Sequence, residues 1–118
     1  MPTSVEVIVS DDRHTHVRIV GPLDLSGVEA IELRFTAHTA SRRRPAIVDL
    51  SEVPVIASLG MGLLTQVSRI LALSHAKLVL LKPRPEVAKA IRTARLDIAM
   101  AIADDLDDAH GHAGLRES

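Results

Sequence analysis

Ser58 and the glycines after it come nearest, by residue type and spacing, to a chemical site. The run Ser58-Leu59-Gly60-Met61-Gly62 places a hydroxyl and a Gly-x-Gly pair at the start of an apolar helical pattern. A helix start can hold a phosphate, but the run lacks the Lys-Ser/Thr of a P-loop and the third glycine of a dinucleotide fingerprint. We therefore predict that Ser58 caps the helix and that Gly60 permits close packing on a sheet. A phosphorylation site at Ser58, or a nucleotide cradle, is the alternative.

Histidine, acidic and arginine clusters are weaker candidates for chemistry. The pairs His14-x-His16 and His110-x-His112 have no third ligand nearby in sequence, so we predict no metal site. Asp104-Asp105 suits the positive end of a helix better than acid–base chemistry. Arg42-Arg43-Arg44 is expected to be a solvated helix end, with an acidic partner or a phospholipid headgroup as the alternative. No nucleophile, base and orienting group can be recognised together, so we predict neither catalysis nor a cofactor.

The composition argues against several classes of function. Net charge is −1, from 14 basic and 15 acidic residues, and Phe35 is the sole aromatic residue, so nothing predicts a nucleic-acid surface. Cysteine is absent, which excludes disulfides and thiolate chemistry. We recognise no signal peptide and no apolar run of about 18 residues, so we expect a cytoplasmic protein without a membrane span. The low net charge favours a monomer or a weak dimer.

Hydrophobic periodicity indicates the elements that must position these residues. Alternating or continuous apolar runs predict strands at residues 5–9, 16–20, 46–50, 77–81 and 98–102, the second of them half-exposed. Patterns of helical period predict helices at about residues 26–40 and 60–74, and another that begins at Pro85. The acidic residues at 104–108 predict the start of a short terminal helix.

The order of these elements predicts the fold class. Strands alternate with helices from the third strand onward, after an initial hairpin, which favours a single α/β domain. Its sheet should be mixed and mostly parallel, with about five strands and about four helices. Ser26 and Glu29 fit a capping box at the start of the first helix. We assign the domain to residues 3–110 and a flexible tail to residues 111–118.

Two motifs then resemble a known family. The stretch Val48-Asp49-Leu50-Ser51 leads through a loop to Ala57-Ser58-Leu59-Gly60, which resembles the central signature of STAS domains, found in anti-sigma factor antagonists. Gly21-Pro22-Leu23-Asp24 is similar to the segment that follows the second strand in that family. The order of elements agrees over about residues 3–110. The resemblance implies a non-catalytic domain that binds an anti-sigma factor of the serine-kinase type.

The resemblance also implies a docking surface and a switch. In the family, phosphorylation of a serine at the start of the second helix turns binding off. We place the usual acceptor directly before the motif glycine, where this chain has Leu59, so we expect no phosphate at residue 59; Ser58 matches the other motif serine, and Ala57 replaces the motif aspartate. The predicted partner-binding residues are Asp24, Ala57, Ser58, Leu59, Gly60, Met61, Gly62, Thr65, Gln66 and Arg69.

Two other functions stay open at this point. Some STAS-like proteins are accessory subunits of the ATPase of a lipid ABC transporter, and the lack of a hydroxyl at residue 59 suits that role as well. A small-ligand or nucleotide sensor would use the helix start at Gly60.

Overall fold

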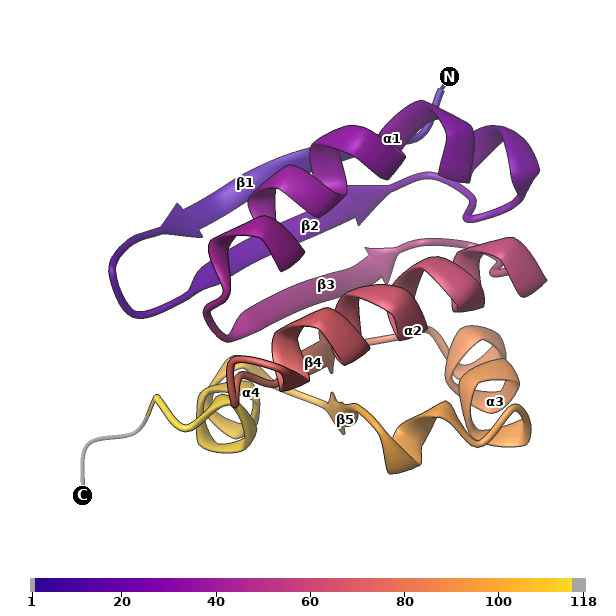
Figure 1. The fold of residues 1–118 in the computed structure, drawn as a ribbon. Helices are drawn as coiled ribbons and strands as arrows, with labels where there is room; N and C mark the ends of the chain where they lie inside the picture. Colours follow the sequence, from indigo (N-terminus) through magenta and orange to yellow (C-terminus); the bar gives the residue numbers. More distant parts are fainter. Residues whose placement is uncertain (1, 116–118) are drawn as a thin grey trace.

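The computed structural model describes residues 2–115 as a five-stranded sheet flanked by helices (Figure 1). The strands lie in the order β1-β2-β3-β4-β5; β1 is antiparallel to β2, and the other neighbours are parallel. The predicted α/β fold with a mixed, mostly parallel sheet is therefore confirmed. The strands are β1 Ser4–Ser10, β2 Thr15–Val20, β3 Ala46–Glu52, β4 Leu78–Leu81 and β5 Ala101–Ala103; the helices are α1 Leu25–His38, α2 Ser58–Ala72, α3 Pro85–Thr93 and α4 Leu106–Ala113, with short 3-10 helices η1 Ala40–Arg42 and η2 Leu96–Ile98.

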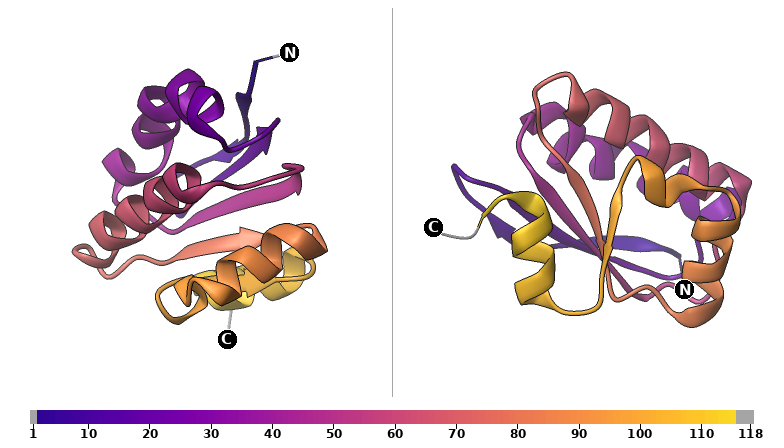
Figure 2. Two further views of the ribbon diagram at one scale, coloured as in Figure 1. Left: turned by 90° about the vertical axis from the view of Figure 1, so that its right-hand side faces the viewer. Right: turned by 90° about the horizontal axis from the view of Figure 1, so that it is seen from below.

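The helices cover the two faces of the sheet unequally. Figure 2 shows α1 and α2 on one face and α4 on the other. The larger core lies under α1, α2 and α3 and includes Phe35 and Leu64, both fully buried. The smaller core lies under α4, where Ala109 packs with Ile47 of β3 and Val79 of β4. None of the described helices has the length and apolar character needed to cross a membrane.

β2 is more buried than its alternating sequence predicted. A strand forms where it was expected at residues 16–20, but the prediction that it is half-exposed is wrong. β2 lies between β1 and β3, and its polar residues Thr15 and His16 are buried. Only Arg18 and Val20 of this strand are intermediate in exposure. The burial of Thr15 and His16 depends on the order of strands in the sheet, which the hydrophobic pattern of one strand does not reveal.

Both site-bearing helices begin earlier than the sequence suggested. The N-cap of α1 is Asp24, whose Oδ1 accepts from the backbone N–H of Gly27 at 2.8 Å, so the predicted cap at Ser26 is wrong. The N-cap of α2 is Ala57, so the predicted cap at Ser58 is also wrong. An isolated parallel bridge between Leu23 and Ile56 fixes the chain just before each helix, which sets where both can begin.

The C-terminal elements agree with the sequence in kind but not in their bounds. Pro85 opens α3 as predicted, and Asp105 caps α4 by accepting from the N–H of Asp108 at 2.8 Å. The last strand was predicted at residues 98–102, but η2 takes the first part of that segment and β5 is shorter. α4 continues to Ala113, three residues into the segment that we assigned to a tail. The flexibility of that segment stays a prediction, and residues 116–118 lie outside the described chain.

β1 forms one edge of the sheet and is irregular. Its register with β2 shifts between Val7 and Val9, so the strand carries a bulge near its middle. Val7 and Ile8 are exposed beside the bulge.

Candidate docking surface

The two motif segments lie side by side at the carboxyl ends of β2 and β3. The N–H of Leu23 donates to the carbonyl of Val55 at 2.9 Å, and the N–H of Ala57 donates to the carbonyl of Leu23 at 3.0 Å. A third bond joins Gly21 to Glu52 at 3.0 Å. Segments about 30 residues apart in sequence thus extend the parallel pairing beyond the strands and bring the starts of α1 and α2 to one end of the sheet (Figure 1).

Gly60 permits this close approach. A Cβ at residue 60 would lie 2.6 Å from the carbonyl oxygen of Leu23 and 2.8 Å from its Cβ. Gly62, in contrast, faces open space, with nothing within 4 Å of an added Cβ. The prediction that Gly60 serves close packing is confirmed, and Gly60 is buried. A hollow of about 320 Å³, lined in part by Ser68, His75 and Lys77, lies away from this helix start.

Ser58 is an exposed residue in the first turn of α2. Ala57 supplies no side-chain cap, and within residues 2–115 the Ser58 hydroxyl makes no hydrogen bond. The first N–H groups of α2 therefore lack a side-chain acceptor, and they carry the positive end of the helix dipole. A hydroxyl at this position is accessible to another protein and is adjacent to donors that favour negative charge.

The joined segments that carry Ser58 also carry exposed apolar side chains. Leu59 is 53% exposed and Val55 is 51% exposed, whereas Met61 is partly buried against the larger core. Leu25, which opens α1 directly after the cap, is 56% exposed and was not predicted. Its one sequence signal is its place outside the apolar stripe of Val28, Ile31 and Phe35. The patch of Leu25, Val55 and Leu59 combines one residue from α1, one from the segment that leads into α2 and one from the first turn of α2.

The outer face of α2 continues this surface. Gly62, Gln66 and Arg69 are exposed at helical spacing from Leu59. Thr65 is half-buried, and its hydroxyl donates to the carbonyl of Met61 at 2.8 Å. Asp24 is likewise occupied, because its carboxylate caps α1. The predicted partner-binding residues thus divide by exposure: the exposed set is Ala57, Ser58, Leu59, Gly62, Gln66 and Arg69, and the half-buried or buried set is Asp24, Gly60, Met61 and Thr65.

The two histidine pairs meet near the amino end of the sheet. The rings of His14 and His110 are in edge contact, with centroids 5.6 Å apart. Burial lowers the pKa of His14 and that of His16. No group of three or more histidine and acidic residues is arranged to hold a metal ion in the part of the chain that is described. The contact joins the turn just before β2 to α4 and is not near the docking surface.

The family model of the STAS domain matches residues 6–109. The fold is similar to a protein of Thermotoga maritima proposed to be an anti-sigma factor antagonist, at 16% identity over 88% of this chain and 90% of that one, with a TM-score of 0.79. It is also similar to the anti-sigma factor antagonist SpoIIAA in its unphosphorylated form, at 20% identity over 97% and 100% of the chains, with a TM-score of 0.74.

An anti-sigma factor antagonist of Mycobacterium paratuberculosis is 25% identical over 94% of this chain and 95% of its own, with a TM-score of 0.67. No curated protein sequence matches the chain.

Proposed function

Because this chain belongs to the STAS domain family, we propose that it is a non-catalytic regulator that binds a partner protein through the carboxyl end of its sheet, as an anti-sigma factor antagonist does. The partner would be an anti-sigma factor of the serine-kinase type, and the complex would form in the cytoplasm with the chain as a monomer or weak dimer. The similar structures named as anti-sigma factor antagonists support this reading.

The observation that carries the proposal is the exposed apolar patch at the joined motif segments. Leu25, Val55 and Leu59 each leave about half or more of their surface uncovered, at one end of the sheet. Apolar surface that gathers at one site favours association, because a partner that covers it releases water. The polar outer face of α2 would then supply the rim, with Gln66 and Arg69 exposed beside the patch.

Ser58 is the residue through which phosphorylation would act. SpoIIAA has been solved in a phosphorylated form as well as an unphosphorylated one, and Leu59 offers no hydroxyl. A phosphate on Ser58 would add about 1.5 to 2 negative charges. The uncapped N–H groups of α2 would stabilise that charge within the domain. The same charge, beside the exposed Leu59, would oppose burial of the apolar patch by a partner.

The test of the surface is Leu59→Asp, compared with Leu33→Asp as a matched control. Leu33 is 88% exposed on α1 and lies outside the proposed surface. We expect Leu59→Asp to weaken binding to a purified anti-sigma factor kinase about tenfold or more, equivalent to about 1.4 kcal/mol, while Leu33→Asp and the wild type bind alike. Binding is measured by calorimetry, after a tagged capture from the native cell has identified the partner. Equal binding by all three proteins would contradict the surface.

The test of the switch is intact-mass analysis after incubation with the kinase and ATP. We expect a single added phosphate in the wild type and none in Ser58→Ala, and we expect Ser58→Glu to bind the partner more weakly than Ser58→Ala. An unmodified protein recovered with a transporter ATPase would instead favour the role of an accessory subunit. The buried backbone of Gly60 gives no support to a nucleotide cradle at that helix start.

A further inference from the structure

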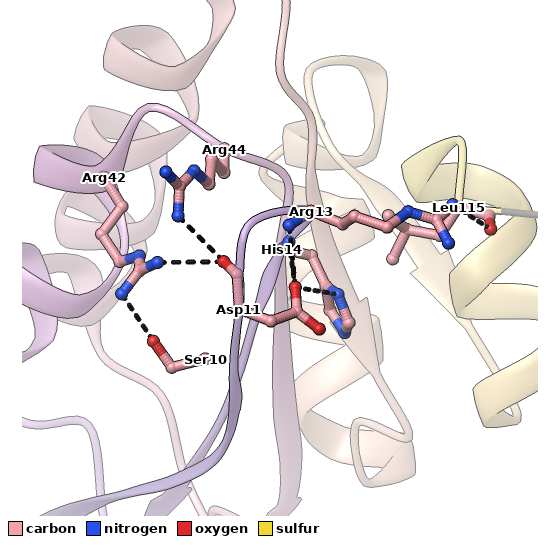
Figure 3. Close-up of polar contacts among 7 residues, drawn as sticks. All are labelled: Ser10, Asp11, Arg13, His14, Arg42, Arg44 and Leu115. Atoms are coloured by element: carbon pink, nitrogen blue, oxygen red, sulfur yellow. Dashed lines mark hydrogen bonds and ion pairs between the residues drawn. The ribbon is translucent and has the colours of Figure 1, made fainter.

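The turn between β1 and β2 gathers arginine side chains that come from the segment before β3 (Figure 3). Arg42 donates through Nη2 to the backbone carbonyl of Asp11 at 3.0 Å, and Arg44 donates through Nη1 to the same oxygen at 2.9 Å. Arg42 also donates through Nη1 to Oγ of Ser10 at 2.6 Å. Two guanidinium groups therefore converge on one neutral oxygen at the amino end of the sheet.

Among the described residues, no carboxylate pairs with either guanidinium group. The carboxylate of Asp11 faces away from them and accepts from the backbone N–H groups of Arg13 and His14, at 2.8 and 2.9 Å. Within residues 2–115, the ion pairs are Arg18 with Asp49, His14 with Asp11 and His112 with Asp108, so neither Arg42 nor Arg44 takes part in one. Nε of Arg42 is buried and has no hydrogen-bond partner in the described part of the chain.

This arrangement has an electrostatic consequence. Like charges held close together repel, and one uncharged carbonyl oxygen offsets only part of that repulsion. An anion placed between the two guanidinium groups would remove it. The two guanidinium groups are already held by hydrogen bonds to the turn, so binding an anion would cost little side-chain conformational entropy.

We propose that Arg42 and Arg44 form a binding site for a phosphate-bearing ligand. Guanidinium groups match phosphate because their planar forks of N–H donors meet its oxygens in pairs. The hydroxyl of Ser10 accepts from Arg42 and keeps its own O–H to donate. Arg43 is exposed next to the pair and adds positive charge. The ligand is a phosphate monoester in solution or the phosphate of a lipid headgroup, and the site is at the opposite end of the sheet from the docking surface.

Titration with inorganic phosphate, followed by NMR, tests the site. At pH 7.5 and constant ionic strength kept with chloride, we expect saturable shifts of the Ser10 and Asp11 amides and of the arginine Nε–H signals, with a millimolar dissociation constant. Arg42→Gln combined with Arg44→Gln should abolish the saturable shifts. Arg34→Gln combined with Arg92→Gln removes the same charge from exposed helix positions and should leave them unchanged.

Additional variants separate charge from folding. Arg44 makes one hydrogen bond to the turn, so Arg44→Gln alone tests the site if the double variant unfolds, and it should weaken binding at least fivefold. Arg44→Lys keeps the charge but loses the fork, and should fall between Arg44→Gln and the wild type. Shifts that rise linearly with phosphate, or equal shifts in a folded Arg44→Gln variant, would overturn the proposal.

Vesicle flotation identifies the source of the phosphate. Flotation with phosphatidylglycerol vesicles, lost in the double variant and absent with phosphatidylcholine vesicles, would assign the site to a lipid headgroup. Saturable phosphate binding without flotation would assign it to a soluble ligand.

Discussion

At the scale of single residues, His16 sets an expectation for pH dependence. It is buried in β2, and its Nε2 has no hydrogen-bond partner among the described residues. Burial lowers its pKa, and the charges of His14, Arg18 and His110 lower it further, while Asp49 opposes this. The pKa of His14 is lowered by burial and by His110 and Arg13, against Asp11. Both residues therefore favour the neutral form when the chain is folded.

The sign of the effect follows from these directions. A histidine with a lowered folded-state pKa binds fewer protons when folded than when unfolded, so the free energy of unfolding rises with pH. The stabilisation is complete above the ordinary value of 6.5 and is lost as pH falls from there through the lower folded-state pKa. Hydrogen bonds from the backbone N–H groups of His14 and Arg13 lower the pKa of Asp11. The contribution of Asp11 to stability is therefore lost only as the pH falls below its ordinary pKa of 3.8.

We expect the free energy of unfolding to decrease between pH 6.5 and pH 5, and His16→Leu to reduce that slope. Urea unfolding at pH 7.5, 6.5 and 5.0 measures it. Because His16→Leu removes an unpaired buried nitrogen, we expect it to cost little or even to stabilise at pH 7.5. His75→Asn is the control, since His75 is exposed and asparagine tolerates its φ of 58°. An unchanged slope in His16→Leu would show that other groups carry the pH dependence.

At the scale of elements, the packing of α2 depends on Gly60. Gly60→Ala would press a methyl group against the Leu23 backbone, so we expect it to destabilise by about 1 to 3 kcal/mol. Gly62 lies on the same helix, and a Cβ added there would meet open space. Gly62→Ala should therefore raise the free energy of unfolding by about 1 kcal/mol, because alanine has a higher helix propensity than glycine. Thermal and urea unfolding of the two variants measure this contrast. Equal effects would show that the start of α2 can shift away from Leu23 at little cost.

Sequence patterns predicted which elements form but not where they begin. Both Asp24 and Ser26 are good capping residues, and local sequence offers no means to choose between them. The choice is made by the bridge between Leu23 and Ile56, which holds Leu23 extended up to the cap. Similarly, the burial of His16 depends on β3 lying beside β2, which is a property of the sheet and not of the strand.

Of the two proposed sites, only the docking surface was predictable from the sequence, because sequence motifs mark its segments. The segments at Asp24 and Ser58 were assigned to one surface by resemblance, and their pairing brings them together. The convergence of Arg42 and Arg44 on Asp11 was not predicted, since the partners lie more than 30 residues apart in sequence. It arises because the chain enters β2 and β3 side by side, with the N–H of Thr15 bonded to the carbonyl of Pro45 at 3.0 Å.

At the scale of the whole molecule, the two proposed sites lie at opposite ends of the sheet. The seven residues of β3 separate them by about 20 Å. Sites this far apart, without shared contacts, behave additively to within about 0.5 kcal/mol. We expect Arg44→Gln to leave partner affinity unchanged, and Leu59→Asp to leave phosphate binding unchanged. Calorimetry on both single variants and the double variant measures the coupling, and a coupling above about 1 kcal/mol would show that the ends communicate.

The bulge in β1 bears on how the protein behaves at high concentration. An edge strand offers unpaired N–H and C=O groups on which another chain can add a strand, and exposed Val7 and Ile8 would reward such pairing. The bulge between Val7 and Val9 breaks the even spacing of those groups, so an incoming strand cannot match them along its whole length. The irregular register of this seven-residue edge strand thus protects against aggregation, although Val7 and Ile8 are themselves uncharged.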